Sequence, residues 1–266
     1  MTAIGEYAFG GVSNLTSVYV KATTPPTLGD NAFFSLPSFN IVVPSGSVND
    51  YKEATNWSEY AAHIQTVSPT ASGYCGSPNQ TDVSWTFYGD VMDMLVISGT
   101  GAIASYTPSE APWYEHRESI TSVEIGNGVT TINNGDFTGL QQLESITIGP
   151  GVTSIVAGAF NGCSKLASVN FIEGTSPMTI GPSAFSYCGK IASISLPNNV
   201  TTLHSMAFAY CTELNFLNLG NGVTTIENGA FGNCTSLTAV TIPNSVTTLD
   251  NAFQNCTKLV TVVIGH

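Results

Sequence analysis

A phenylalanine returns at nearly regular intervals over most of this 266-residue chain. In the second half of the sequence the intervals are 23, 25, 23, 23 and 22 residues, counted along Phe137, Phe160, Phe185, Phe208, Phe231 and Phe253. Two earlier members of the series, Phe9 and Phe33, lie 24 residues apart. A fixed period in the low twenties indicates a stack of similar structural units, each called a rung below, and it excludes most globular folds.

Other positions recur in register with this phenylalanine. Ala precedes it in seven rungs and Asp136 is the exception, while Cys follows it three residues later at Cys163, Cys188, Cys211, Cys234 and Cys256. Apolar residues occupy the positions six, nine and eleven residues after it, as in Leu214, Leu217 and Leu219. The alternation at the last positions predicts a short strand with one buried face. One rung cannot bury that face alone, so we expect a continuous core along the stack.

The remainder of each rung is rich in Thr, Gly and Asn, which are poor helix formers. We expect turns and short strand-like pieces there, with a single 3₁₀ or α turn beside the Ala-Phe motif. The rung after Phe160 is two residues longer and should bulge between Ile172 and Pro177. The predicted fold class is a β-rich repeat solenoid with repeats of about 23 residues, one short parallel strand per rung and little helix.

The unit L-x-x-V-x-I-P-x-x-V-x-x-I-x-x-x-A-F-x-x-C resembles the BspA-like class of leucine-rich repeats, found on surface proteins of anaerobic bacteria and some protozoa. The resemblance covers residues 1–43 and 119–266 and implies a right-handed leucine-rich-repeat solenoid. It also implies adhesion to host matrix proteins, to other cells or to glycans. The chain departs from the better-known pattern with a fixed Asn after L-x-x-L-x-L, because only Asn199 stands there; the other rungs have Gly151, Gly222 and Ser245.

Residues 44–66 interrupt the period. A turn at 44–47 and the segment 48–54 predict a short helix capped by Ser45 or Ser47. Further apolar residues follow at helical spacing, at Trp57, Tyr60 and Ile64. We interpret this segment as a closing lid, since the last rung of a solenoid otherwise exposes its core.

Residues 67–74 are typical of a linker, and residues 75–118 of an opening β cap with strands at 83–88 and 94–98. The predicted domains follow from these segments. A first array ends at residue 66 with the helical cap 44–66, and a second array spans 75–266 with its β cap 75–118 and repeats 119–266. Both chain ends fall inside repeats, so we expect open apolar cross-sections that favour end-to-end self-association.

Composition restricts the partners and the compartment. With 6 basic and 18 acidic residues the net charge is −12, which argues against nucleic acid and anionic membranes as partners. The sequence contains no run of 18 apolar residues, so it predicts no insertion into a membrane. The Thr-, Ser-, Asn- and Gly-rich composition and the resemblance indicate a secreted or cell-surface protein. We expect its signal or anchor outside this chain, since residues 1–6 lack one.

Three residue types could carry chemistry, and each has a structural interpretation. The repeat cysteines form no C-x-x-C pair, so a ladder of buried thiols is favoured over a metal, redox or nucleophilic site, with rung-to-rung disulfides left open. The histidines, His63, His116, His204 and His266, are scattered and adjoin no nucleophile motif. Six acidic residues in the cap match no calcium loop, which favours a solvated face over a calcium site or a glycosidase pair; they are Asp82, Asp90, Asp93, Glu110, Glu115 and Glu118. We predict no cofactor, no metal and no enzymatic activity.

The remaining candidate site is the outward face of the predicted strands, eight and ten residues after each phenylalanine. It carries hydroxyls and amides with a single aromatic residue. The predicted ligand-binding residues are Ser122, Glu124, Ser145, Thr147, Ser168, Asn170, Ser193, Ser195, Phe216, Asn218, Thr241 and Thr261. Solenoids bind through such extended faces, but Ser and Thr also fit an exposed sheet that binds nothing.

Three functions therefore stay open. The first is a non-enzymatic binding module for an extracellular protein or glycan, and the second is a structural spacer or self-assembling element. The third is an enzyme with its site in the 75–118 cap, which a deep pocket there would favour.

Overall fold

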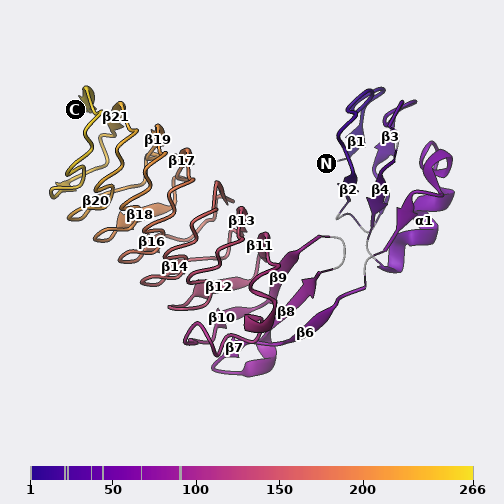
Figure 1. Ribbon diagram of the computed structural model, residues 1–266, viewed down its shortest axis with the longest axis horizontal. Helices are drawn as coiled ribbons and strands as arrows, with labels where there is room; N and C mark the ends of the chain where they lie inside the picture. Colours follow the sequence, from indigo (N-terminus) through magenta and orange to yellow (C-terminus); the bar gives the residue numbers. More distant parts are fainter. Residues whose placement is uncertain are drawn as a thin grey trace. The chain divides into compact units, whose positions relative to one another are not determined.

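The computed structural model describes residues 2–20, 22, 24–36, 38–43, 45–66, 68–89 and 92–265. The chain divides into two compact units, Met1–Ser68 and Pro69–His266 (Figure 1). The boundary falls inside the predicted linker 67–74, of which residue 67 lies outside the described residues.

The N-terminal unit stacks short parallel strands in two sheets. Strand β1 (Ala3–Ile4) pairs with β3 (Thr27–Leu28), and β4 (Asn40–Val42) lies between β2 (Ser17–Tyr19) and β5 (Ile64–Gln65). Its core contains the stacked rings of Phe9 and Phe33, with centroids 5.4 Å apart and planes 5° from parallel. Phe9 and Phe33 therefore occupy equivalent positions in two neighbouring rungs, as their spacing in the sequence predicts.

The predicted lid closes the N-terminal unit. It contains a 3₁₀ turn η1 (Ser45–Ser47), helix α1 (Val48–Glu53) and a 3₁₀ helix η2 (Trp57–Tyr60), while Ile64 begins β5 instead of continuing a helix. Ser47 occupies the N-cap position but its side chain makes no cap hydrogen bond, so the predicted capping by Ser47 is wrong. The side chain of Ser45, the alternative cap, lies outside the described part of the chain.

Side chains of the lid donate hydrogen bonds to backbone carbonyls of the rung that the lid covers. The indole Nε1 of Trp57 donates to the carbonyl of Pro26, and the Tyr51 hydroxyl donates to that of Ala22, each at 2.8 Å. Trp57 and Tyr51 are fully buried. The lid thus covers apolar side chains and satisfies backbone carbonyls at once, which a bare apolar plug would not do.

The C-terminal unit begins with antiparallel strands and continues with parallel ones. Strands β6 (Ala71–Tyr74), β8 (Val83–Tyr88) and β9 (Met94–Gly99) pair antiparallel, which confirms the strands predicted at 83–88 and 94–98. Because β6 pairs with β8 from Ala71 to Tyr74, the predicted linker is wrong for residues 71–74. The short 3₁₀ turns η3 (Gln80–Asp82) and η4 (Tyr114–His116) complete the cap.

Parallel strands in register extend this first sheet along the repeats. From β9 the order runs through β11 (Ser122–Ile125) and β13 (Ser145–Ile148) to β15 (Ser168–Phe171). The next rungs add two paired sets, β17 (Ser193–Ser195) with β19 (Phe216–Asn218) and β21 (Ala239–Ile242) with β23 (Thr261–Ile264). These strands, one in each rung, are the ones that the apolar alternation in the sequence predicts.

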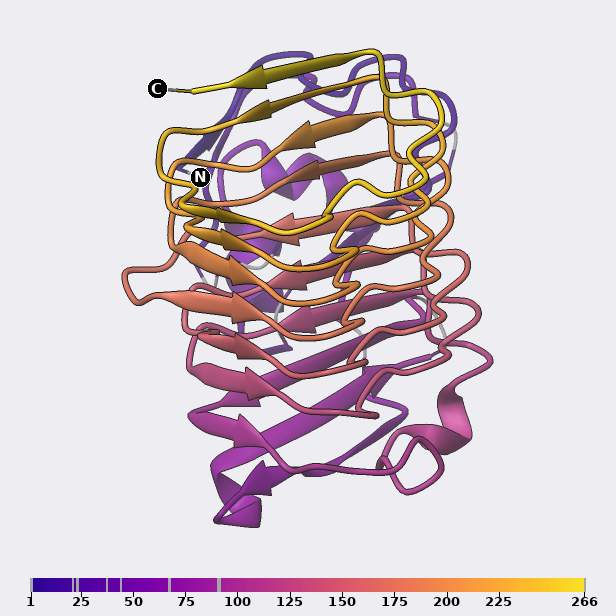
Figure 2. The ribbon, with the colours of Figure 1, turned by 90° about the vertical axis from the view of Figure 1, so that its left-hand side faces the viewer.

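Each rung also carries a second short strand, so the prediction of one strand per rung is incomplete. These strands form one eight-stranded sheet, in which β7 (Gly76–Ser77) pairs antiparallel with β10 (Gly101–Ile103) and all other pairs are parallel. The others are β12 (Val129–Ile132), β14 (Ser154–Ile155), β16 (Met178–Ile180), β18 (Val200–Leu203), β20 (Thr225–Ile226) and β22 (Thr248–Leu249). Figure 2 shows the strands of the two sheets running in opposite directions on each rung. The longer rung bulges between β15 and β16, as predicted (Figure 2).

The segment around each core phenylalanine is neither 3₁₀ nor α-helical. The residues two before and two after the phenylalanine adopt left-handed backbone, as in Ser183 (φ 53°) and Tyr187 (φ 61°) around Phe185. The N–H groups of these three residues donate to carbonyls of the next rung at 2.7–3.0 Å. A third ladder of hydrogen bonds therefore joins the rungs, although a non-glycine residue in this conformation costs about 1–2 kcal/mol.

The phenylalanines form one continuous stack through the C-terminal unit. Ring centroids of successive members lie 5.0–5.5 Å apart and their planes are within 11° of parallel, from Trp113 of the cap through Phe137, Phe160, Phe185, Phe208 and Phe231 to Phe253. The five from Phe137 to Phe231 are fully buried. Each ring is thus a contact shared by two neighbouring rungs.

Replacing a ring in the middle of this stack should be costly. We expect Phe185→Ala to lower the free energy of unfolding by about 3–5 kcal/mol, because the cavity interrupts contacts with both neighbours. Phe216→Ala, at a side chain 54% exposed, should change it by less than about 0.5 kcal/mol. Urea unfolding followed by circular dichroism measures both, and equal losses in the two variants would contradict the role of the stack.

Candidate functional site

The predicted strand-face residues lie on β11, β13 and β15 of the first sheet and on the two strand pairs β17–β19 and β21–β23 of the later rungs. Ser122, Ser145 and Ser168 are register partners on β11, β13 and β15, and so are Glu124, Thr147 and Asn170. On the following rungs Ser193 pairs with Phe216 and Ser195 with Asn218, while Thr241 and Thr261 lie on β21 and β23. The structure therefore aligns the predicted residues into two lines that cross the strands. We call these twelve residues the strand face.

Exposure changes along the strand face. The positions on β11 and β13 are half-buried, whereas Ser168, Asn170 and the members on later strands are exposed. Phe216 is the one aromatic member, and Glu124 the one charged member. Asn218 already accepts a hydrogen bond at 3.1 Å from the backbone N–H of Gly220. A ligand on this face would meet mainly hydroxyls, amides and one apolar ring.

The same surface continues onto the cap, which the sequence analysis missed. Met94 and Val96 of β9 are register partners of Ser122 and Glu124, and Tyr88 of β8 lies opposite Met94. These side chains are half-buried and more apolar than the repeats. The alternation of β8 and β9 was visible in the sequence, but the cap has no repeat register with which to align it.

The repeat cysteines are buried free thiols, as the favoured interpretation predicted. Each Sγ donates to the carbonyl of the phenylalanine one rung earlier, at 3.1–3.4 Å. Four of these carbonyls also accept a backbone N–H of their own rung, so the thiol adds a second hydrogen bond, from the neighbouring rung. Burial raises the pKa of Cys211 to about 12 and that of Cys75, in the cap, also to about 12. Such thiols stay protonated at neutral pH and are poor nucleophiles and metal ligands.

The described histidines do not come together. His63 Nδ1 lies 2.9 Å from the Phe39 carbonyl, the His116 ring stacks on Phe87, and His204 Nδ1 lies 3.0 Å from Glu227 Oε1. His266 and, in the acidic cap, Asp90 lie outside the described residues. Within the described ranges no three His, Cys, Asp or Glu side chains form a group able to hold a metal ion.

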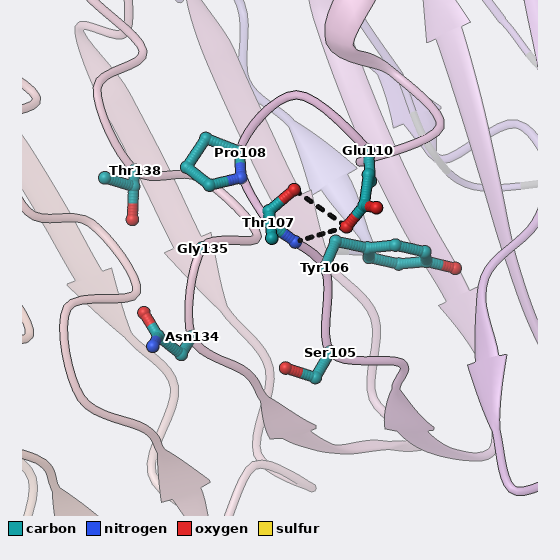
Figure 3. A pocket seen from close by; sticks show the side chains of 8 residues that line it. All are labelled: Ser105, Tyr106, Thr107, Pro108, Glu110, Asn134, Gly135 and Thr138. Carbon is teal, nitrogen blue, oxygen red and sulfur yellow. Dashed lines mark hydrogen bonds between the residues drawn. The ribbon is translucent and has the colours of Figure 1, made fainter.

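A pocket of about 350 Å³ lies where the cap meets the first rungs (Figure 3). Its walls come from the cap segment after β10 and from the turn beside Phe137. The lining residues are Ser105, Tyr106, Thr107, Pro108, Glu110, Asn134, Gly135 and Thr138. Of the six acidic residues singled out in the cap, only Glu110 belongs to this set.

The pocket is lined by hydrogen-bonding groups, one of which is a carboxylate. Glu110 Oε2 accepts from the Thr107 hydroxyl at 2.7 Å and from its N–H at 3.3 Å, and these bonds lower the pKa of Glu110 (Figure 3). An ionised carboxylate held in this way cannot serve as a general acid near neutral pH. Among the eight lining residues there is no His, Lys or Cys. The hydroxyl, amide and carboxylate groups of the pocket suit a small polar molecule.

Asp136 is a buried acid in the column that otherwise holds alanine. Its Oδ2 accepts from the Asn133 N–H at 2.7 Å, whereas its Oδ1 has no hydrogen-bond partner among the described residues. Burial raises the pKa of Asp136 to about 8, against the hydrogen bond from Asn133, which lowers it. The charge of this carboxyl in turn raises the pKa values of Cys75 and Tyr106, although burial is the larger cause for both.

The shift of Asp136 predicts a pH dependence of stability. Below about pH 4 both folded and unfolded states are protonated; between about pH 4 and 8 only the unfolded state loses the proton, so the free energy of unfolding falls as pH rises. One such group contributes at most about 1.4 kcal/mol per pH unit. We expect Asp136→Ala and Asp136→Asn to remove this slope, measured by urea unfolding from pH 4 to 8. Slopes identical to the unsubstituted chain would contradict it.

A stack of rungs with a parallel sheet, a polar outer strand face and buried thiols defines a leucine-rich-repeat type of solenoid. The model of the BspA type leucine rich repeat region matches this chain in six copies, over residues 1–65, 110–178 and 178–266. The chain belongs to this family. In the described part of the chain no helix has the length and apolar character needed to cross a membrane.

Solved structures of bacterial repeat proteins are similar to this chain. A leucine-rich repeat protein from Eubacterium ventriosum is 19% identical, with 73% of this chain and 85% of that one covered and a TM-score of 0.36. The pneumococcal vaccine antigen PcpA is 19% identical, over 72% and 49%, with a TM-score of 0.46. A leucine rich cell surface protein from Faecalibacterium prausnitzii is 18% identical, over 99% and 83%, with a TM-score of 0.33. Comparison with curated protein sequences gives no significant match.

Proposed function

We propose that this chain is a non-enzymatic binding module of a secreted or cell-surface protein, and that it holds an extracellular protein or glycan on the strand face. The observation that carries the proposal is the alignment of hydroxyl and amide side chains across successive rungs. Ladder hydrogen bonds already use the backbone of these strands. The exposed side chains are thus held in fixed positions and available to a ligand.

Phe216 supplies the apolar anchor of the proposed site. Its side chain is 54% exposed although Leu217 beside it is buried, and its register partner is the small Ser193. Aromatic residues contribute a large share of binding energy at interfaces, while surrounding polar contacts fix orientation. With one such anchor the affinity per chain should be modest, and repeated display on a surface would raise it.

The chemistry of the titratable groups supports a module without catalysis. The described histidines contact backbone, aromatic rings or a carboxylate, and the thiols are buried. The residues that line the pocket at the cap include no His, Lys or Cys. The chain belongs to the BspA type of leucine-rich repeats, and this supports the proposed location because the resemblance to that class implies a surface protein.

The strand face can be tested by binding to a panel of extracellular matrix proteins and glycans. We expect saturable binding that Phe216→Ala weakens at least about 10-fold, or roughly 1.4 kcal/mol. Ser195→Ala, on the neighbouring strand, should weaken it less. Phe34→Ala is a matched control, since Phe34 is 55% exposed but belongs to the N-terminal unit. Binding that survives Phe216→Ala and is lost in Phe34→Ala would refute the strand face as the site.

Self-association is a second candidate, favoured by one observation. Strand β23 exposes Val262, Val263 and Ile264 by 50%, 51% and 66%. If these side chains mediate assembly, sedimentation velocity should show species that grow with concentration, and Val262→Thr with Ile264→Thr should abolish them. A monomer at all concentrations would exclude this function for the chain.

A further inference from the structure

Two tyrosines, exposed Tyr187 and half-buried Tyr210, stack on each other at the turn edge of the C-terminal unit. The rings of Tyr187 and Tyr210 have centroids 4.4 Å apart and planes 6° from parallel. Each residue stands two positions after a core phenylalanine. The same position carries glycine or asparagine in the other rungs of this unit, at Gly139, Gly162, Asn233 and Asn255.

The backbone at this position does not suit tyrosine. Both residues have φ of 61°, in the left-handed region that glycine and asparagine enter far more readily. The conformation is held because the N–H of Tyr187 donates to Ala209 O at 2.9 Å and that of Tyr210 to Gly232 O at 2.8 Å. The side chain of Tyr187 remains 52% exposed, so burial does not offset the strain. Exposed Tyr7 and Met206 share this left-handed conformation, so Tyr187 is distinguished by an exposed ring that stacks on a second ring.

One face of the Tyr187 ring is free to receive such a ligand. Tyr210 backs the opposite face, while the two preceding rungs carry Gly162 and Gly139 in the same column. No heavy atom of the described residues beyond the chain neighbours lies within 4 Å of where a Cβ on either glycine would stand. The open length beside the ring is therefore about two rungs, or roughly 10 Å at the spacing of neighbouring strands.

Polar side chains border this open segment. Gln141 Nε2 donates to Gly162 O at 3.0 Å, Ser164 Oγ donates to Gln141 Oε1 at 2.7 Å, and Lys165 Nζ donates to Gln142 Oε1 at 2.6 Å. A flat aromatic face beside amide, hydroxyl and ammonium groups matches a pyranose ring, whose axial C–H bonds form an apolar face within a rim of hydroxyls. The net charge of −12 disfavours a polyanionic glycan.

We propose that the free face of Tyr187, above Gly162 and Gly139, is a carbohydrate-binding site that takes a pyranose ring of a neutral glycan. The ring stacks on Tyr187, and its hydroxyls bond to the polar groups beside Gly162. Tyr210 is a positioning residue that holds the Tyr187 ring in place. This site lies on the turn segment of the rungs and is independent of the strand face proposed above.

Three variants test the site by titration with neutral hexasaccharides of β-1,4-glucose, α-mannose and β-1,4-N-acetylglucosamine, followed by calorimetry and tyrosine fluorescence. We expect at least one sugar to bind, and Tyr187→Gly to weaken it at least about 10-fold. Gly162→Asn, a residue type that the same column holds at Asn233, should also block binding by covering the ring face. Tyr210→Asn should weaken binding less than Tyr187→Gly does.

Stability separates a binding role from a structural one. Tyr187→Gly should leave the melting temperature unchanged or raise it, because glycine relieves the left-handed strain. Phe216→Ala should bind the sugar like the unsubstituted chain. The inference is overturned if no hexasaccharide binds, or if Tyr187→Gly and Gly162→Asn bind normally. Sugar binding lost only in Phe216→Ala would also overturn it, while leaving the proposed function of the strand face in place.

Discussion

The stacking of one phenylalanine on the next is the interaction on which the rest of this solenoid depends. Each ring fills the space between two rungs, and the carbonyl of the same residue receives the thiol of the following rung. Side chain and backbone of one position thus fix the distance and the register of neighbouring rungs. Trp113 begins the stack in the cap, and its Nε1 donates to Asp136 O at 2.9 Å. The cap therefore resembles a rung in its core while differing from one in its strands.

The parts of the fold that follow from burial were readable from the sequence, and those set by backbone conformation were not. The first strand of each rung (β11, β13, β15, β17, β19, β21 and β23) and the longer rung follow from apolar periodicity, and the lid follows from its interruption. The second strand of each rung was expected only as short strand-like pieces, because its sequence, as in Val200–Leu203, buries its two ends and leaves two threonines between them, without alternation. Strand β6 was missed because Ala-Ser-Gly-Tyr has linker composition and gains its order only by pairing with β8. The left-handed positions accept Gly, Asn, Ser, Met and Tyr, so residue type does not reveal them.

The candidate sites also divide into a part that the sequence predicts and a part that depends on the fold. The strand face was predicted as a set, since a period of two places its residues outward whatever their identity. Its continuation onto Tyr88, Met94 and Val96 depends on how the cap pairs with the first rung, which no repeat register specifies. The Tyr187–Tyr210 stack was missed for a different reason, because two tyrosines 23 residues apart are informative only once the turn is known to point them outward. Repeat proteins thus vary their surfaces at two kinds of position, one on the strands and one on the turns.

The buried thiols can report local unfolding of the rungs. Five rungs each hold one cysteine, and every Sγ is engaged with the backbone of the rung before it. A thiol-specific reagent can reach such a group only after that rung separates from its neighbour, and the rate of labelling then measures the frequency of the separation. Cysteines spaced one rung apart would resolve this frequency along the length of the array without any added probe. Labelling of these five cysteines would therefore identify the rung of the C-terminal unit that separates first.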